Sequence, residues 1–232
     1  MNSIEETLLD IGEERRILVE TESKRILEQW GIPVVGCEVA TSREEALRLA
    51  HSMGFPVVLK ILSPDIIHKT EAGGVKLNLT TDEGVRSAFD EIMGNARRDS
   101  PSASVFGVTV QKMVSGIEVA IGVTKDPQFG RVLMFGIGGL WVELLKDITF
   151  RLIPIDATDA DEMIRDIQGF PLLKGYRGRS ADMEGLARML VKVSDLIMAY
   201  PDIDEMDLNP VITAPAGNVV ADARVILAES LG

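Results

Sequence analysis

The pattern that most restricts the fold of this 232-residue chain is a series of strand-like segments separated by short connections. Residues 105–114 and 118–124 are two such segments joined by a Ser115-Gly116 turn, and residues 131–136 form a third. Segments joined in this way predict antiparallel hairpins. Helical patterns occur between the strands, so the sequence predicts an α+β fold of two lobes rather than a doubly wound parallel sheet.

The remaining elements follow from apolar periodicity and from capping signals. Ser42 and Glu45 form a capping box, in which the hydroxyl accepts the N3 amide and the carboxylate reaches back. In the first half we predict helices within residues 1–20 and at 21–30, 43–53 and 82–97, with strands at 34–40, 57–60 and 75–79. In the second half we predict helices at 158–168 and 183–200 and strands at 151–155, 203–208, 211–213 and 219–222.

Composition excludes several classes of protein. The net charge of −12 argues against nonspecific nucleic-acid binding, which needs a basic surface. The apolar runs are too short to span a membrane, and the acidic, polar N-terminus is unlike an export signal. Cys37 is the single cysteine, so a disulfide framework is excluded and the cytoplasm is the expected compartment.

The stretch from Val57 to Lys76 has the highest density of candidate functional residues. Lys60 ends an apolar run, which predicts a buried strand that brings an ammonium group to the edge of a site. His68 lies in a polar loop, where it is either a general base, a substrate contact, a phosphoryl-accepting nucleophile or simply an exposed histidine. The other histidine, His51, lies in a predicted amphipathic helix and is interpreted as a surface or packing residue.

A second candidate site lies near the C-terminus. On a strand, Glu205, Asp207 and Asn209 share one face, and Asp222 is expected on the strand that follows the next turn. Oxygen ligands from two adjacent strands suit Mg²⁺, although a solvated acidic edge would have the same composition. The glycine-rich turn at residues 136–139 offers backbone amides to a phosphate but lacks the Lys-Ser/Thr of a Walker A loop.

Four runs of the sequence resemble a known family. They are VVLKILSPDIIHKTEAGGVKLNL, VQKMVSGIEVAIGVTKDPQFG, VLMFGIGGLWVELLKD, and EMDLNPV with VADAR. Together they resemble the nucleotide-binding β subunit of ADP-forming acetyl-CoA synthetase, an NDP-forming acyl-CoA synthetase related to succinyl-CoA synthetase. The likeness covers residues 22–227. It implies an ATP-grasp fold, in which two α+β lobes close on Mg-ATP. The domains implied are an appended helix at 1–20, an N-terminal lobe at 21–108 and a C-terminal lobe at 109–232.

The resemblance also assigns roles to residues of the nucleotide site. Lys60 matches the lysine that contacts the ATP phosphates, and Glu118 matches the nucleotide-site glutamate. Gln111 and the backbone that follows it match the hinge that reads adenine, where succinyl-CoA synthetase relatives have a carboxylate at position 111. The nucleotide-site residues implied in this way are Lys60, Gln111, Lys112, Met113, Val114 and Glu118.

The metal and the phosphoryl carrier are assigned in the same way. Asn209 and Asp222 resemble the Mg²⁺ ligands, and Asp207 serves either the metal or the histidine. His68 matches a second phosphorylatable histidine that distinguishes this family from succinyl-CoA synthetase. The implied reaction converts acetyl-CoA, ADP and phosphate reversibly into acetate, ATP and CoA, with His68 carrying the phosphoryl group to ADP. The implied partner is a CoA-binding α subunit in an α2β2 heterotetramer.

Three alternatives stay open from the sequence. The first is a succinyl-CoA or malyl-CoA synthetase-like β chain, which would not need His68 and typically carries a longer C-terminal domain. The second is a noncatalytic, regulatory nucleotide-binding subunit, which would tolerate loss of His68. The third is the ATP-grasp part of a fused acyl-CoA synthetase or protein acetyltransferase. The acidic helix expected after Met1 favours a separate subunit.

Overall fold

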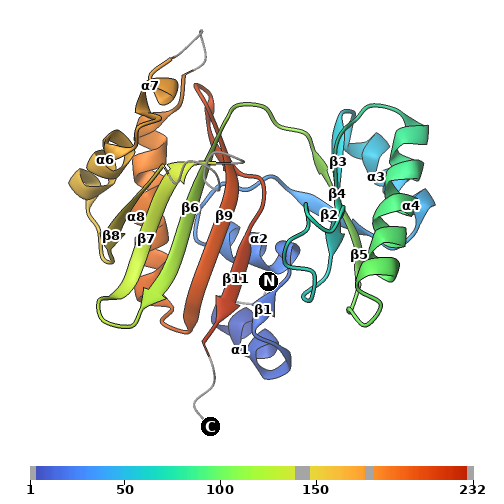
Figure 1. Ribbon diagram of the computed structural model, residues 1–232, viewed down its shortest axis with the longest axis horizontal. Coiled ribbons are helices and arrows are strands. Elements are labelled where there is room, and N and C mark those ends of the chain that lie inside the picture. The colour runs from blue at the N-terminus through green and yellow to red at the C-terminus, as the bar shows by residue number, and fades with distance from the viewer. Residues whose placement is uncertain (1–3, 139–146, 176–179, 229–232) are drawn as a thin grey trace. The chain divides into compact units, whose positions relative to one another are not determined.

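The computed structural model describes residues 4–138, 147–175 and 180–228 (Figure 1). The chain divides into two compact units, Val35–Val114 and a larger one made of Met1–Val34 with Ser115–Gly232. Within the described residues every strand ladder is antiparallel, as the sequence predicts, and the one parallel contact is an isolated bridge between Val34 and Val220. None of the described helices has the length and apolar character needed to cross a membrane.

The smaller unit is a four-stranded antiparallel sheet with two helices on one side (Figure 1). Its elements are β2 (Cys37–Ala40), α3 (Arg43–Met53), β3 (Val57–Leu62), β4 (Val75–Leu79), α4 (Asp82–Asp99) and β5 (Gly107–Lys112). The strand order is β2-β5-β3-β4. Alternate residues of β3 and β5, such as Leu59 and Val110, pack in the core together with Leu49 of α3 and Ile92 of α4.

The helix α3 begins with the predicted capping interaction. Ser42 Oγ accepts a hydrogen bond from the amide of Glu45 at 3.2 Å. The Glu45 carboxylate reaches back one residue further than the standard capping box, because it accepts from the amide and the hydroxyl of Thr41. These hydrogen bonds hold the pKa of Glu45 below its ordinary value.

The larger unit is a seven-stranded antiparallel sheet, with strand order β1-β11-β9-β6-β7-β8 and with β10 paired to β9 (Figure 1). Its elements are α1 (Ile4–Glu14), β1 (Ile17–Leu18), α2 (Glu20–Gln29), β6 (Ile117–Asp126), β7 (Gly130–Ile137), β8 (Ile148–Leu152), α6 (Ala157–Asp166), α7 (Phe170–Leu173), α8 (Met183–Ala199), β9 (Ile203–Ala214), β10 (Gly217–Val220) and β11 (Arg224–Leu227).

One face of this larger sheet is covered by helices. Ile121, Phe135 and Leu208 point to that face and join a continuous apolar core with residues of α1, α2, α6 and α8. One stripe of α8, which includes Leu186, Leu190 and Val193, is fully buried there. Residues at the intervening strand positions point to the opposite face, which carries the polar residues described below.

The division into units differs from the boundaries expected at residues 20/21 and 108/109. Ile26 and Leu27 of α2 are buried in the core of the larger unit, and so are Ile4 and Leu8 of α1. Residues 17–18, which the periodicity assigned to a helix, form β1 and pair with β11. The smaller unit includes β5, because that strand lies between β2 and β3 in its sheet, and the unit therefore ends after β5 rather than before it.

The predicted hairpin of residues 105–114 with 118–124 is wrong. β5 pairs with β2 and β3, whereas β6 pairs with β7 and β9, so the chain re-enters the larger unit at Ser115. Gly116 is needed for a reason unrelated to a hairpin turn, because a Cβ there would lie 2.4 Å from the carbonyl oxygen of Thr213.

Other strands also differ from the prediction in extent, and those near the candidate site matter most. β8 spans Ile148–Leu152 rather than 151–155, and β9 is one strand through Asn209 and Pro210. Asp222 lies in the bend between β10 and β11 rather than on a strand.

Candidate functional site

In the smaller unit, β3 carries Lys60 on the sheet face that α3 and α4 do not cover. The side chains of Leu59 and Ile61 enter the core, so Lys60 points the other way, and it is only 5% exposed. Its partner across the ladder is Thr109 of β5, whose Oγ1 is buried and makes no hydrogen bond within the described parts of the chain. A buried ammonium beside a buried hydroxyl suits an anionic or polar ligand.

Gln111 lies on the same face as Lys60. It is buried and sits in β5 between Cys37 of β2 and Val58 of β3 in the ladder. Cys37 is half-buried in this edge strand. The structure therefore brings Lys60 and Gln111 onto one sheet face, two positions apart along the central strands.

The residues after Gln111 are held by the turn that precedes β3. The Lys112 ammonium donates to the carbonyl oxygens of Gly54 at 2.5 Å and Phe55 at 2.8 Å, and the Met113 amide donates to the carbonyl of Pro56. The Lys112 side chain is thus committed to the fold of its own unit. This leaves its backbone, as the resemblance implies, as the part that is suited to reading a base.

His68 is exposed at the outer part of a loop that is tied down at both ends. At the first end Ile66 is buried in the core, and the Asp65 carboxylate accepts from the Ser104 amide at 2.6 Å. At the second end the Asn95 amide donates to the carbonyl of Gly73 at 3.1 Å. The His68 side chain is therefore presented by a segment whose ends are fixed while its apex faces solvent.

The base of the same loop fits closely against β3. The Gly74 carbonyl accepts from the Ile61 amide, and the Gly74 amide donates to the Lys69 carbonyl, both at 2.7 Å. A Cβ at Gly74 would lie 2.6 Å from Ile61 Cγ2, so only glycine fits without a shift. The paired glycine of the sequence is therefore the anchor of the loop.

In the larger unit, β9 presents the predicted acidic face. Met206 and Leu208 are buried in the core, whereas Glu205, Asp207 and Asn209 lie on the opposite face, as the period of two predicts. The residue types at these positions are hard oxygen donors. The strand thus supplies three such side chains to the sheet face that none of the described helices covers, which we call the helix-free face.

Asp222 is brought to the same place by the register of the neighbouring strands. β10 pairs Val220 with Val211, and the Ala221 amide then donates to the Pro210 carbonyl at 2.9 Å. β11 resumes the same register, because Arg224 pairs with Asp207. Continuing it across the bend places Asp222 opposite Asn209. Two protein oxygens, completed by waters and phosphate oxygens, are the usual environment of Mg²⁺.

The described residues contain no cluster of three or more His, Cys, Asp or Glu side chains that would hold a metal without a substrate. The donor set of one amide and one carboxylate therefore fits a cation that arrives with a nucleotide and fits a resident metal poorly.

A cavity of about 200 Å³ lies beside Asp207 on the helix-free face. Phe150, Met134, Gly122, Asp207 and Arg224 are successive ladder partners across β8, β7, β6, β9 and β11, and all five line it. One end is apolar. At the other end Arg224 Nη2 lies 3.5 Å from Asp207 Oδ2. The cavity thus combines an apolar wall with an ion pair.

Arg224 is a site residue that the sequence reasoning missed. It follows Asp222 by two positions, so a strand continued past Asp222 would have placed both on one face. The prediction ended that strand at residue 222, before β11.

Glu118 is exposed on β6, opposite Ile212 of β9. Its carbonyl accepts from the Gly138 amide at 2.8 Å, which brings the start of the glycine-rich turn beside it. A Cβ at Gly138 would lie 3.0 Å from the Glu118 carbonyl carbon, so a larger residue would push the turn away. The rest of that predicted phosphate-binding turn, from Gly139, lies outside the described residues.

The fold and the arrangement of these residues define the class of protein. An ATP-grasp domain model matches residues 11–227. The β subunit of ADP-forming acetate–CoA ligase I from Pyrococcus furiosus is 48% identical over 216 residues, which are 92% of this chain and 93% of that one. The single-chain ADP-forming acetate–CoA ligase I from Archaeoglobus fulgidus is 44% identical over 92% of this chain, which spans only 31% of its length.

A solved relative gives the same result. The dinucleotide-forming acetyl-coenzyme A synthetase 1 of Ca. Korarchaeum cryptofilum, in complex with coenzyme A and Ca-AMPCP, superposes with a TM-score of 0.92 at 43% identity, covering 97% of this chain and 100% of that one. Another structure of that protein holds Mg-AMPPCP, with a phosphohistidine segment pointing towards the nucleotide-binding site, and has a TM-score of 0.82 at 41% identity. The chain belongs to the ATP-grasp family, in the group of ADP-forming acetate–CoA ligase β subunits. The α+β, ATP-grasp fold predicted from the sequence is confirmed.

Proposed function

We propose that this chain is the nucleotide-binding β subunit of an ADP-forming acetate–CoA ligase. The reaction would convert acetyl-CoA, ADP and phosphate into acetate, ATP and CoA, reversibly, with His68 as the phosphoryl carrier. The observation that carries the proposal is the loop of residues 63–74, because it exposes His68 while both of its ends are anchored. A carrier that serves two stations needs an exposed apex on fixed ends, and its transfer between the stations would require the apex to move.

His68 has the chemistry that such a relay needs. An acyl phosphate forms in the α subunit from acyl-CoA and phosphate, and a histidine there accepts the phosphoryl group. The neutral imidazole of His68 attacks that phosphorus, forming one P–N bond as the other breaks. A terminal oxygen of ADP then attacks, and the imidazole leaves with its electron pair restored. Phosphoryl transfer of this kind needs mainly positioning and charge neutralisation.

The neutralisation and the base recognition are assigned to residues of each unit taken separately. In the smaller unit, Lys60 would contact the nucleotide phosphates, and Gln111 with the backbone of Lys112, Met113 and Val114 would read adenine. The buried hydroxyl of Thr109 supports a polar ligand on this face. In the larger unit, Glu118 is the nucleotide-site glutamate.

A magnesium ion would arrive with the nucleotide. Asn209 and Asp222, opposite each other in register, would hold it, and it would neutralise phosphate charge there. Asp207 lies two residues before Asn209 on β9, on the same face of the strand, and its carboxylate is 3.5 Å from Arg224. We assign Asp207 to orienting the incoming imidazole, because Arg224 already balances its charge.

The proposed partner is a CoA-binding α subunit, in an α2β2 assembly in the cytoplasm. Two relatives are β subunits, and a single-chain relative contains this region as about a third of its length. Acyl specificity would then belong to the α subunit, since no acyl or CoA site is assigned to this chain.

The test uses labelled phosphate and the two histidines of the chain. The chain is mixed with its α subunit, acetyl-CoA and ³²P-phosphate, without ADP. Label is expected on the wild-type chain and, at the same level, on a His51→Gln chain. The His68→Ala chain is expected to carry no label. His51 is a matched control because it is an exposed histidine whose Nε2 lies 3.0 Å from Asp82 Oδ1 at the surface.

Adding ADP completes the experiment. The label on the wild-type chain is expected to move to ATP, whereas the His68→Ala chain is expected to form no labelled ATP. Normal transfer to ADP by the His68→Ala chain would refute the relay. It would favour a noncatalytic or succinyl-CoA synthetase-like role, which does not need this histidine.

A further inference from the structure

Large apolar side chains are exposed on the helix-free face of the larger sheet, on its β7–β8 side. Phe150 and Leu152 of β8 are 49% and 52% exposed. Their ladder partners on β7, Met134 and Val132, are only half-buried. We name these four residues the β7–β8 strip. A contiguous exposed apolar patch is typical of an interaction surface, whereas a single exposed leucine is not.

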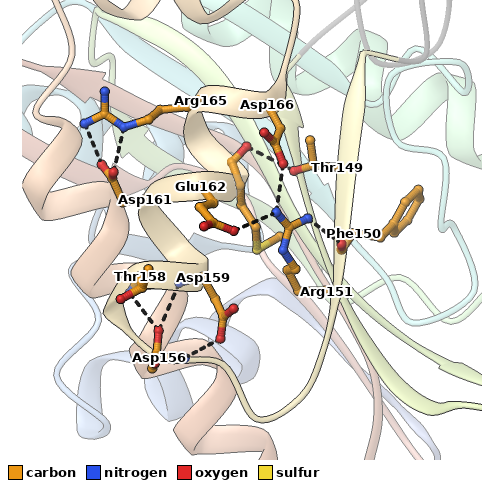
Figure 2. A network of polar contacts seen from close by, with 11 residues as sticks. Thr149, Phe150, Arg151, Asp156, Thr158, Asp159, Asp161, Glu162, Arg165 and Asp166 are labelled. Carbon is orange, nitrogen blue, oxygen red and sulfur yellow. Dashed lines mark hydrogen bonds and ion pairs between the residues drawn. The ribbon is translucent and has the colours of Figure 1, made fainter.

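The orientation of β8 is fixed by its other face. Thr149 Oγ1 donates to the carbonyl of Met163 in α6 at 3.1 Å. Arg151 donates to Asp166 at 2.7 Å and lies 3.5 Å from Glu162. The hydrogen bond to Asp166 also raises the pKa of Arg151, so the guanidinium stays charged. Figure 2 shows Arg151 directed at α6, with the ring of Phe150 pointing away from it.

This anchoring decides how the exposure of Phe150 is explained. Turning β8 over to bury Phe150 and Leu152 would break the bonds of Thr149 and Arg151 to α6, because alternate residues of a strand face opposite sides. β8 is also at the edge of the sheet. The contacts of β8 with α6 therefore keep the strip on the exposed face of the sheet.

The strip continues into the cavity beside Asp207. Gly122 contributes no side chain to this part of the sheet face, and a Cβ there would lie 3.1 Å from Met134 Cε. Beyond it stand Asp207, Arg224 and the exposed Glu205, which together carry one net negative charge. The surface thus has an apolar part, a hollow and a slightly acidic end.

We propose that the β7–β8 strip and this cavity are the docking surface for the α subunit, which would place apolar side chains on the strip and a basic side chain near Glu205. This inference rests on the proposed function, since the α subunit is part of it. The single-chain relative from Archaeoglobus fulgidus shows that more than two thirds of such an enzyme lies outside the region matched here. A surface for that remainder is what an α subunit would need from this chain, and an apolar patch with a polar rim is the usual anatomy of such an interface.

The test compares binding of the α subunit to three chains. They are the wild type, Phe150→Ser/Leu152→Ser, and the control Met198→Ser. Met198 is 58% exposed on α8, so the control removes an equally exposed apolar side chain away from the strip. Binding to immobilised α subunit is measured by interferometry. Mg-ADP binding by each chain alone is measured by calorimetry, and self-association by sedimentation.

The expected result is that the double variant binds the α subunit about tenfold or more weakly, since buried aromatic anchors dominate interface energies. The control variant is expected to bind like the wild type, and all three chains are expected to bind Mg-ADP alike. Equal α-subunit binding by all three chains would overturn the docking surface and leave the proposed function standing.

Other outcomes also overturn the proposal, and each is distinguishable. A wild-type chain that binds no α subunit refutes the proposed partnership, and the docking surface with it. A double variant that loses Mg-ADP binding would assign the strip to the nucleotide site. A wild-type chain that self-associates, while the double variant does not, would assign the strip to a second copy of the chain.

Discussion

A buried ion pair in α2 gives the sharpest prediction about the larger unit. Lys24 Nζ lies 2.8 Å from Glu20 Oε1, and the two side chains are 4% and 0% exposed. Lys24→Met keeps most of the apolar stem and removes the ammonium. Removing one partner of a buried pair costs about 3–5 kcal/mol of unfolding free energy, because a charge is left buried without that partner.

Protonation of Glu20 sets an upper limit to this cost. A carboxyl with an ordinary pKa near 4.3 is neutralised at pH 7 at a cost of about 3.7 kcal/mol, and at pH 5 at about 1 kcal/mol. In the variant the buried carboxylate of Glu20 loses the cation that favours its charged form, while burial disfavours that form. The variant therefore gains stability relative to the wild type as the pH falls through that window. We expect a deficit of about 3–4 kcal/mol at pH 7 and about 1 kcal/mol at pH 5.

Urea unfolding followed by tryptophan fluorescence measures this deficit. Trp30 and Trp141 are the two tryptophans of the chain, and both fall in the sequence ranges of the larger unit. The double variant Glu20→Leu/Lys24→Met is expected to recover most of the loss, because it removes both charges of this buried pair. A loss below about 1 kcal/mol at pH 7, or a loss independent of pH, would refute the reasoning.

Three further predictions concern the candidate site. Arg224→Ala is expected to slow phosphoryl transfer between His68 and ADP, while urea unfolding shifts by less than about 1 kcal/mol because the pair with Asp207 is partly solvated. Asp222→Asn is expected to weaken calorimetric ADP binding in Mg²⁺ and to leave binding in EDTA unchanged, and equal weakening in both buffers would remove Asp222 from the metal site. Gly74→Ala is expected to lower the rate of His68 phosphorylation by α subunit and to destabilise the chain by about 1–3 kcal/mol, since the added methyl overpacks against Ile61; an unchanged rate would show that the loop base does not position the histidine.

Local signals predicted the elements of the smaller unit well. β4 matches the predicted span of residues 75–79, and α3 begins at the predicted capping box. Both depend on short-range physics, namely a period of two and a hydroxyl that accepts an amide three residues on. The acidic face of β9 was predictable for the same reason, since alternation alone places Asp207 and Asn209 together.

Long-range pairing was not predictable from the same signals. Ser115-Gly116 looks like a hairpin turn, yet the chain leaves one sheet there and enters another. Gly116 is required by the carbonyl of Thr213, which is nearly a hundred positions away. β1 and β11 are short, with two and four residues, so neither gives a periodic signal strong enough to separate it from its flanks.

The register of β9 with its neighbours β10 and β11 determines which candidate-site residues lie opposite one another. β10 and β11 share one antiparallel register with β9, although the bend at residues 221–223 separates them. Because side chains alternate with a period of two, this register places Asp222 and Arg224 on the same face as Asn209 and Asp207. A slip of one residue would turn Asp222 and Arg224 to the core, away from Asn209 and Asp207. The hairpin between β9 and β10 is therefore part of the site, since its length decides which face the second carboxylate occupies.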